Sequence, residues 1–241
     1  SLISVDGGMA VWVRDSTKTY VEPEVIPNTD YKYLAFPYMV ANAYPKLTAD
    51  STNLKAHYKF DDASNIGLDS KNNINLINTG LDTETGQIEL SGHFDTNDDY
   101  LYKSDANISW NTWSNNNGFT ISFWFKIDSS HPDWNTFLWS QEDGSSHRIM
   151  FRKQENTNGI EFDVRNQTNG LLCGLYSGTI TNFTETYHHI SIVFKTNDAK
   201  MYVDGLVVDS TTTASIAISN TNNYLYLGHH DGQTRGHKGN F

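Results

Sequence analysis

The chain alternates apolar and polar side chains along many short segments. Between Phe119 and Ile127 every second residue is phenylalanine or isoleucine, whereas the residues between them are threonine, serine, tryptophan and lysine. Successive side chains of a β-strand point to opposite faces of its sheet, so this alternation predicts a strand with one buried face. The same pattern predicts strands at residues 54–60, 149–151, 160–164, 188–194 and 224–227.

A hairpin turn is predicted at Asp204 and Gly205. These two residues separate the apolar-rich segments 201–203 and 206–208, and an Asp-Gly pair accepts the positive φ angles of a two-residue type I′ turn. Short segments bounded by Asn, Gly, Asp and Ser recur along the chain, and no segment of similar length has a helical period. The pattern therefore predicts an all-β fold, an antiparallel two-sheet β-sandwich.

The first 50 residues differ from the rest in composition. They are rich in aromatic residues and hold four of the five prolines of the chain, Pro23, Pro27, Pro37 and Pro45. We therefore predict an extended N-terminal arm, or part of a preceding domain, at residues 1–50 and the sandwich at residues 51–241. Two interpretations of the arm stay open: it docks on its own sandwich or on a neighbouring subunit, or it is an ordered leader packed against its own domain.

Charge and apolar content argue against two classes of partner. The formal net charge is −11 and no cluster of lysine and arginine occurs, whereas nucleic-acid binding depends on cations at the phosphates. The longest apolar stretches are far shorter than the roughly 20 residues that span a bilayer, so membrane insertion is not expected. The single cysteine, Cys173, cannot form an internal disulfide and is predicted to be a small core residue.

Several motifs follow one another in an order that is typical of one family. They are Leu54–Asp62, Gly92–Tyr100, Phe119–Lys126, Tyr187–Ile190 and Tyr202–Gly205. Together they resemble laminin-G-like jelly-roll domains of the concanavalin A-like lectin/glucanase superfamily over residues 54–232. The resemblance implies a two-sheet jelly-roll sandwich and a role in recognition or adhesion outside a cell.

The chain departs from the family pattern at two places. Tyr187 stands where the family usually has tryptophan, and residues 239–241 stand where a final Gly-x-Ile-Asp-type strand is expected. That strand normally pairs near the first strand, so we expect a sandwich that lacks its last strand and leaves the edge at residues 54–60 open. An open strand edge invites pairing, so another chain or a continuation of the polypeptide is expected to fill it.

A glycosidase motif is present only in part. Laminarinase-type hydrolases of this fold carry two catalytic glutamates on one strand, and the segment from Glu161 to Asp163 is similar to the first half of their motif. Arg165 and Asn166 occupy the places of the second glutamate, whereas a retaining mechanism needs two carboxyl groups about 5 to 5.5 Å apart. The sequence therefore predicts no enzymatic activity.

Two groups of residues are candidates for ligand binding. If the predicted strands are neighbours, their outward side chains form one polar face suited to sugar recognition, made of Trp124, Glu161, Asp163, Arg165, His189 and Tyr202. The loops at the rim of the sandwich supply a second group, made of Trp110, Trp113, Trp134, His230, Asp231 and Arg235. The alternatives are an ordinary solvated face and aromatic residues that anchor loops.

Calcium is the metal that the resemblance implies, because family members often hold one. Hard oxygen ligands are plentiful at Asp61, Asp62, Asp69, Asp95, Asp98 and Asp99. Acidic loops are also common without a metal. The His188-His189 and His229-His230 pairs do not predict zinc, because adjacent residues of a strand point to opposite faces.

Three functions are compatible with these features. The leading hypothesis is a non-catalytic recognition or adhesion module that binds carbohydrate, or a protein ligand, on a cell or virion surface. The alternative is a structural minor capsid or surface protein of a large DNA virus, which contacts neighbouring subunits through residues 1–50 and an open strand edge; the asparagine-rich composition suits an AT-rich genome. The third hypothesis is a glycoside hydrolase.

Overall fold

The computed structural model describes residues 2–5, 9–12, 54–71, 74–104, 118–131, 136–142, 147–166, 170–214, 224–229 and 236–241. For residues 2–5, 9–12, 136–142 and 147–148 the description is of the backbone alone. The chain divides into two compact units, Ser1–Asp50 and Ser51–Phe241. Within the described ranges the regular elements are all strands, and no helix there is long and apolar enough to cross a membrane.

The first unit contains one hairpin. Strand β1 (Leu2–Val5) pairs antiparallel with β2 (Met9–Trp12), with Leu2 opposite Trp12. The other residues of the predicted N-terminal arm lie outside the described residues. Its docking role stays a prediction.

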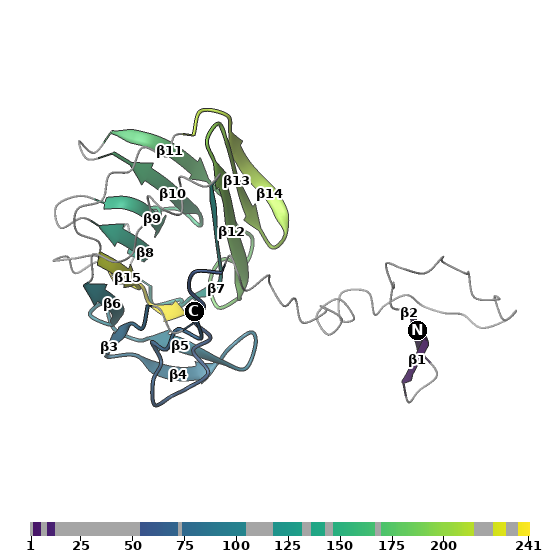
Figure 1. Ribbon diagram of the computed structural model, residues 1–241. Helices are drawn as coiled ribbons and strands as arrows, with labels where there is room; N and C mark the ends of the chain where they lie inside the picture. The colour runs from purple at the N-terminus through teal and green to yellow at the C-terminus, as the bar shows by residue number, and fades with distance from the viewer. Residues whose placement is uncertain are drawn as a thin grey trace, which may run out of the picture. The chain divides into compact units, whose positions relative to one another are not determined.

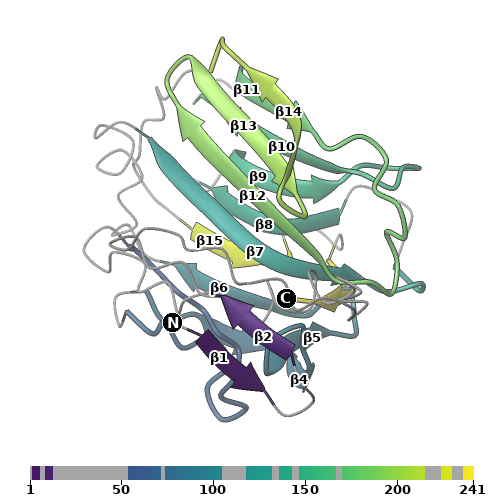
Figure 2. The same cartoon turned by 90° about the vertical axis from the view of Figure 1, so that its right-hand side faces the viewer.

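The second unit contains two seven-stranded sheets that face each other (Figures 1 and 2). Sheet I has the strand order β11-β10-β9-β8-β15-β6-β3. Its strands are β3 (Ile77–Thr79), β6 (Tyr100–Ser104), β8 (Thr136–Glu142), β9 (His147–Lys153), β10 (Ile160–Arg165), β11 (Leu171–Tyr176) and β15 (Tyr224–Leu227).

Sheet II has the strand order β14-β13-β12-β7-β16-β5-β4. Its strands are β4 (Asp82–Thr85), β5 (Leu90–Phe94), β7 (Phe119–Ile127), β12 (His188–Lys195), β13 (Asp198–Val203), β14 (Leu206–Thr211) and β16 (Gly239–Asn240). Neighbouring strands in both sheets run antiparallel. The prediction of an all-β antiparallel two-sheet sandwich is confirmed.

The inward faces of the two sheets form one aromatic and aliphatic core. Burial alternates residue by residue along β12, as its sequence predicted. Phe162 of sheet I is fully buried, and its ring lies 4.9 Å from that of Phe151 and 6.4 Å from that of Phe194 of sheet II. Each such side chain contributes roughly 1.5 to 3 kcal/mol through burial alone, so the alternating positions hold the two sheets together.

The predicted hairpin turn is confirmed. Asp204 and Gly205 have φ angles of 49° and 80° and connect β13 to β14. The Asp204 carboxylate accepts a hydrogen bond from the backbone N–H of His189 at 2.9 Å, and its other oxygen lies 2.8 Å from Nδ1 of His188. The turn residue therefore also fixes the start of β12.

The predicted strand at residues 54–60 is wrong. This segment forms only one isolated bridge, between Tyr58 and Asp69. The buried Asp69 carboxylate accepts hydrogen bonds from the backbone N–H groups of His57, Lys71 and Ile74 at 2.7, 2.9 and 3.1 Å. A side chain therefore supplies the acceptors that a neighbouring strand would have supplied.

The expectation that the last strand is lacking is not met either. Strand β16 lies inside sheet II, where Asn240 is opposite His93 of β5 and Lys126 of β7. Its Gly239 has a φ of 138°, and a Cβ there would lie 1.9 Å from the backbone oxygen of Lys126. Only glycine fits this close approach. The sequence did not predict β16 because a strand of two residues is too short to show an alternation of apolar and polar side chains.

Candidate functional site

The six residues predicted to share one polar face lie on two different sheets. Trp124, His189 and Tyr202 belong to β7, β12 and β13 of sheet II, whereas Glu161 and Asp163 belong to β10 of sheet I. Arg165 also lies on β10. The alternation predicted the inward and outward side of each strand correctly, but it holds no information on which strands are neighbours. The predicted single face is therefore not formed.

The outer face of sheet II carries a small aromatic and polar patch. Trp124 lies opposite His189, with ring centroids 5.1 Å apart and an angle of 60° between the rings. Ser122 Oγ lies 2.8 Å from Nε2 of His189, and burial lowers the pKa of this histidine below its ordinary value. Tyr202 lies one strand further, opposite Ser191.

The outer face of sheet I carries a network of paired charges on β9 and β10. Arg152 donates to Glu161, with Nε–Oε2 and Nη2–Oε2 distances of 2.9 and 2.8 Å. Arg165 donates through Nη2 to Asp163 at 2.7 Å, and the Asp163 side chain is 1% exposed. Guanidinium groups therefore engage both carboxylates of the partial glycosidase motif.

A surface hollow adjoins this network. It has a volume of about 460 Å³ and is lined by Arg152, Glu161 and residues 154–157 of the β9–β10 turn. Its lining side chains are polar, with amide, carboxylate, hydroxyl and guanidinium groups. Such groups can hydrogen-bond a polar ligand from several sides.

Four tyrosines form a continuous stripe on the same outer face. Tyr100 and Tyr102 come from β6, and Tyr224 and Tyr226 come from β15. Ring centroids are 5.5 Å apart for Tyr100 and Tyr102, 6.1 Å for Tyr102 and Tyr226, and 6.4 Å for Tyr224 and Tyr226. The His229 ring extends the stripe and lies 5.1 Å from Tyr100.

The stripe and the charged network lie on one transverse row of sheet I. The pairing register runs across the sheet through Ile77, Tyr102, Tyr226, Ser140, Met150 and Asp163. Neighbouring strands are about 4.8 Å apart, so three strand spacings separate Tyr226 from Asp163 by about 14 Å. Ile77 is 54% exposed, whereas Tyr226 is 8% and Asp163 1% exposed, so the row is open at its β3 end.

The sequence contained a signal for the tyrosine stripe that the prediction did not use. Tyr-Leu-Tyr occurs twice, at residues 100–102 and 224–226, and its central leucines, Leu101 and Leu225, are buried in the core. The alternation thus places tyrosines on the outer side of both strands. Only the pairing of β6 with β15 shows that the two motifs form one stripe.

The rim candidates Trp110, Trp113, Trp134, His230, Asp231 and Arg235 lie outside the described residues. Two of the segments that hold them are adjacent in sequence to strands of the stripe. Residues 105–117 follow directly after β6, and residues 230–235 follow His229 after β15. Their role in ligand binding stays a prediction.

Five of the six aspartates predicted to bind calcium use their carboxyl groups for other contacts in the structure, and Asp98 donates its backbone N–H to Thr96. Asp69 accepts three backbone N–H groups, and Asp99 accepts those of Asp95 and Thr96 at 2.9 and 2.8 Å. Asp62 accepts from Ser64, and Asp61 pairs with a lysine. A hydrogen bond with Asp99 raises the pKa of Asp95. In the part of the chain that the structure describes, no three His, Cys, Asp or Glu side chains are grouped to hold a metal ion. Calcium binding stays a prediction.

Several solved structures share this fold at low sequence identity. Domain 4 of AbnA, a GH43 extracellular arabinanase from Geobacillus stearothermophilus, solved in complex with arabinotriose, is 18% identical with a TM-score of 0.56; the match covers 77% of this chain and 87% of that one. The binding domain of Paraclostridial Mosquitocidal Protein 1 is 13% identical, with a TM-score of 0.54 and coverage of 71% and 44%. The binding domain of Botulinum neurotoxin serotype D is 12% identical, with a TM-score of 0.51 and coverage of 72% and 44%. The chain thus spans less than half of each toxin domain.

The comparison of sequences identifies the family. No curated protein matches the chain. A laminin-G family model, described as the concanavalin A-like lectin/glucanases superfamily, matches residues 95–241, which is more than half of the chain. The chain therefore belongs to the concanavalin A-like lectin/glucanases superfamily.

Proposed function

We propose that the chain is a non-catalytic recognition module that binds carbohydrate on the outer face of sheet I. The observation that carries the proposal is the tyrosine stripe of β6 and β15, whose Tyr102 and Tyr226 share one register row with Asp163 of β10. The similar structures include an arabinanase domain in complex with arabinotriose and two toxin binding domains, which is consistent with a binding function. A cell or virion surface is the context that we propose for it.

The chemistry of this face suits sugars. Tyrosine rings offer flat apolar surface to the C–H groups of a pyranose or furanose ring and keep a hydroxyl for hydrogen bonding. Arg152 and Glu161 hold each other in place, so they can hydrogen-bond sugar hydroxyl groups with little additional loss of side-chain entropy.

The same geometry favours binding over hydrolysis. Glycoside hydrolysis needs a carboxylic acid and a second carboxyl group with separate roles. Both candidate carboxylates, Glu161 and Asp163, are engaged by arginines, and Arg165 and Asn166 occupy the place of the second glutamate. The proposed module therefore binds its ligand and leaves it intact.

Replacing Tyr102 with alanine is expected to weaken oligosaccharide binding at least about tenfold, because it removes the half-buried ring at the centre of the stripe. The measurement is a glycan array followed by calorimetric titration, with arabinotriose among the first oligosaccharides. Trp124→Ala is the matched control, because it removes an aromatic ring from the outer face of the other sheet. Thermal melting of both variants confirms that each is folded.

Three results are possible for a folded protein. If only Tyr102→Ala loses oligosaccharide binding, the result supports the proposed face. If only Trp124→Ala loses it, the binding site lies on sheet II instead. Absence of binding to every oligosaccharide would contradict carbohydrate recognition itself.

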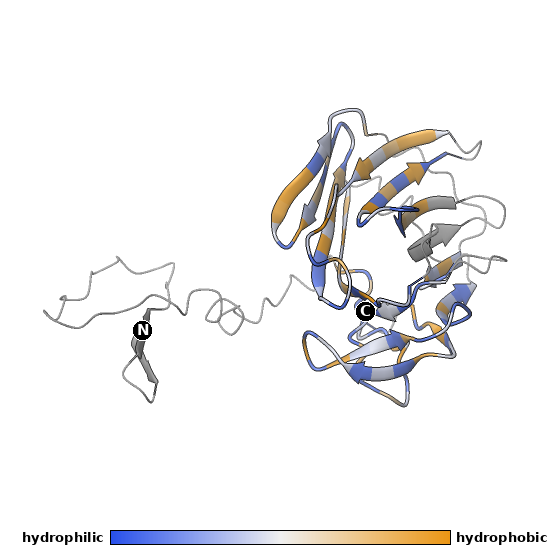
Figure 3. Ribbon diagram, turned by 180° about the vertical axis from the view of Figure 1, so that it is seen from behind, coloured by the Kyte–Doolittle hydropathy of each residue, from blue (hydrophilic) through white to orange (hydrophobic). Residues whose placement is uncertain are grey.

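A second candidate function, protein–protein contact by a structural surface or minor capsid protein, is favoured by strand β14. This strand forms one edge of sheet II, and Figure 3 shows a hydrophobic stretch along it in orange. Three consecutive apolar residues on it, Leu206, Val207 and Val208, are 72%, 56% and 38% exposed. Exposed edge strands with apolar side chains tend to pair with other chains. Self-association that Val207→Lys abolishes, measured by light scattering, would support this function, and a monomer at all concentrations would argue against it.

A further inference from the structure

Strand β16 joins the two halves of sheet II. In the strand order it lies between β5 and β7, so β4 and β5 reach the rest of the sheet through it. The backbone N–H groups of Gly92 and Phe241 each donate to the other residue's carbonyl oxygen at 3.0 Å, and Asp128 donates to Lys238 at 3.1 Å. Residues 238–241 thus provide the backbone contacts that close this sheet.

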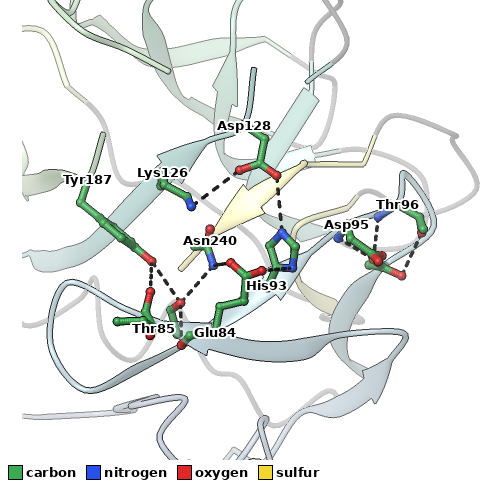
Figure 4. Close-up of polar contacts among 11 residues, drawn as sticks. Glu84, Thr85, His93, Asp95, Thr96, Lys126, Asp128, Tyr187 and Asn240 are labelled. Atoms are coloured by element: carbon green, nitrogen blue, oxygen red, sulfur yellow. Dashed lines mark hydrogen bonds and ion pairs between the residues drawn. The ribbon is translucent and has the colours of Figure 1, made fainter. Parts of the chain in front are cut away.

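Side chains anchor the strand on both faces of the sheet. On the inner face, the Phe241 ring lies 5.1 Å from Phe94 and 5.5 Å from Phe123. On the outer face, the fully buried Asn240 donates through Nδ2 to Ser91 at 3.1 Å and to Glu84 at 3.4 Å (Figure 4). The strand is therefore short but well packed.

His237 is the unusual residue of this segment. It is fully buried, and neither of its ring nitrogens has a hydrogen-bond partner in the described part of the chain. Its ring lies 4.9 Å from Phe241, 5.4 Å from Phe94 and 5.4 Å from His131. A neutral imidazole tolerates this apolar position, whereas protonation would bury a positive charge that no described carboxylate pairs with.

The neighbouring titratable groups do not compensate for a charge on His237. From β5 the nearby titratable group is His93, and from the loop after β7 it is His131; each of them adds positive charge when protonated. The carboxylates of Glu84 and Asp128 lie 3.3 and 3.5 Å from the His93 ring, and no described carboxylate forms an ion pair with His237. Burial, and then the repulsion of His131 and His93, lower the pKa of His237 well below its ordinary value, and an interaction with the backbone of Asn240 offsets only part of this shift.

We propose that β16 is an acid-released latch: His237 holds it closed while the imidazole is neutral, and protonation of that ring frees residues 237–241 from sheet II. Release would expose the edges of β5 and β7 and the Phe241 side chain. Both edges could then pair with another strand. The proposal concerns the control of sheet II and does not depend on the ligand of sheet I.

The sign of the pH dependence follows from linkage. The released segment binds a proton with the ordinary histidine pKa of about 6.5, whereas the closed segment binds it only at lower pH. The closed state is therefore fully favoured above about pH 6.5 and loses stability as the pH falls below that value. One proton increases the opening constant by at most about tenfold per pH unit.

Hydrogen exchange of the whole chain at pH 7.5, 6.5 and 5.5 tests the latch, with each rate corrected for its intrinsic pH dependence. This pH range lies above the ordinary pKa values of Asp and Glu side chains, so their titration does not contribute to the expected change. We expect the amides of Gly92, Asp128 and Phe241 to lose up to about tenfold of their protection between pH 7.5 and 5.5, of which about fivefold falls between pH 6.5 and 5.5. The amide of Asn197, which donates to Ala214 away from β16, should keep its protection.

Two variants make the result specific. His237→Phe and the smaller change His237→Gln both remove the titrating group, so the pH dependence should disappear in whichever of them folds. His57→Gln removes an exposed histidine and should behave as the unmodified chain. Equal protection at all three pH values, simultaneous loss at Asn197, or an unchanged pH dependence in the His237 variants would overturn the proposal.

Discussion

Replacing Phe162 with alanine is expected to lower the free energy of unfolding by about 3 to 5 kcal/mol. The Phe162 side chain is fully buried on β10 and packs against rings from both sheets. Its removal leaves a cavity at the point where the two sheets meet, and a closely packed core refills such a cavity only in part. Urea denaturation followed by tryptophan fluorescence measures the loss.

Leu206→Ala is the matched control for this experiment. Leu206 is an apolar residue of similar size on an edge strand, but it is 72% exposed, so its truncation should change the unfolding midpoint little. Equal losses for Phe162→Ala and Leu206→Ala would show that the core is not the one described above.

Replacing Asp69 with alanine is expected to lower the free energy of unfolding by about 3 kcal/mol. The change leaves three backbone N–H groups, those of His57, Lys71 and Ile74, without their acceptor in a partly buried region. Each unsatisfied buried group costs about 1 to 3 kcal/mol, part of which local rearrangement recovers. Urea denaturation measures the loss, and Asp69→Asn should retain part of the stability because its amide oxygen still accepts.

Asp61→Ala provides the control for the acidic segment. Asp61 forms a surface ion pair with Lys59 at 3.6 Å, and such pairs contribute little to stability. If Asp69→Ala were no more destabilising than Asp61→Ala, the carboxylate of Asp69 would not be the element that holds residues 54–74 in place.

Local patterns predicted the central strands of the fold well. Strand β7 and the hairpin at Asp204 and Gly205 could be predicted because alternation and turn chemistry are properties of neighbouring residues. Strand β16 could not be predicted in the same way, because two residues show no period and its position depends on pairing with β5 and β7. The position of such a short strand depends on pairing partners that lie far away in the sequence.

The candidate site was predictable only in part for the same reason. The outward side of Glu161 and Trp124 followed from alternation, but their assignment to different sheets depends on which strands pair. Asp69 shows a different difficulty, since an aspartate in a polar loop is equally compatible with metal binding and with acceptance of backbone hydrogen bonds. The structure shows the second of these roles.

Carbohydrate binding on the outer face of sheet I is tested most directly by the location of a bound oligosaccharide. The measurement is chemical-shift mapping of the isotope-labelled chain during titration with the oligosaccharide that binds best. We predict saturable shifts at the backbone amides of Tyr102, Tyr226 and Glu161, with little change at Trp124 and His189. Shifts confined to Trp124 and His189, or no saturable shift with any oligosaccharide, would contradict the proposed site.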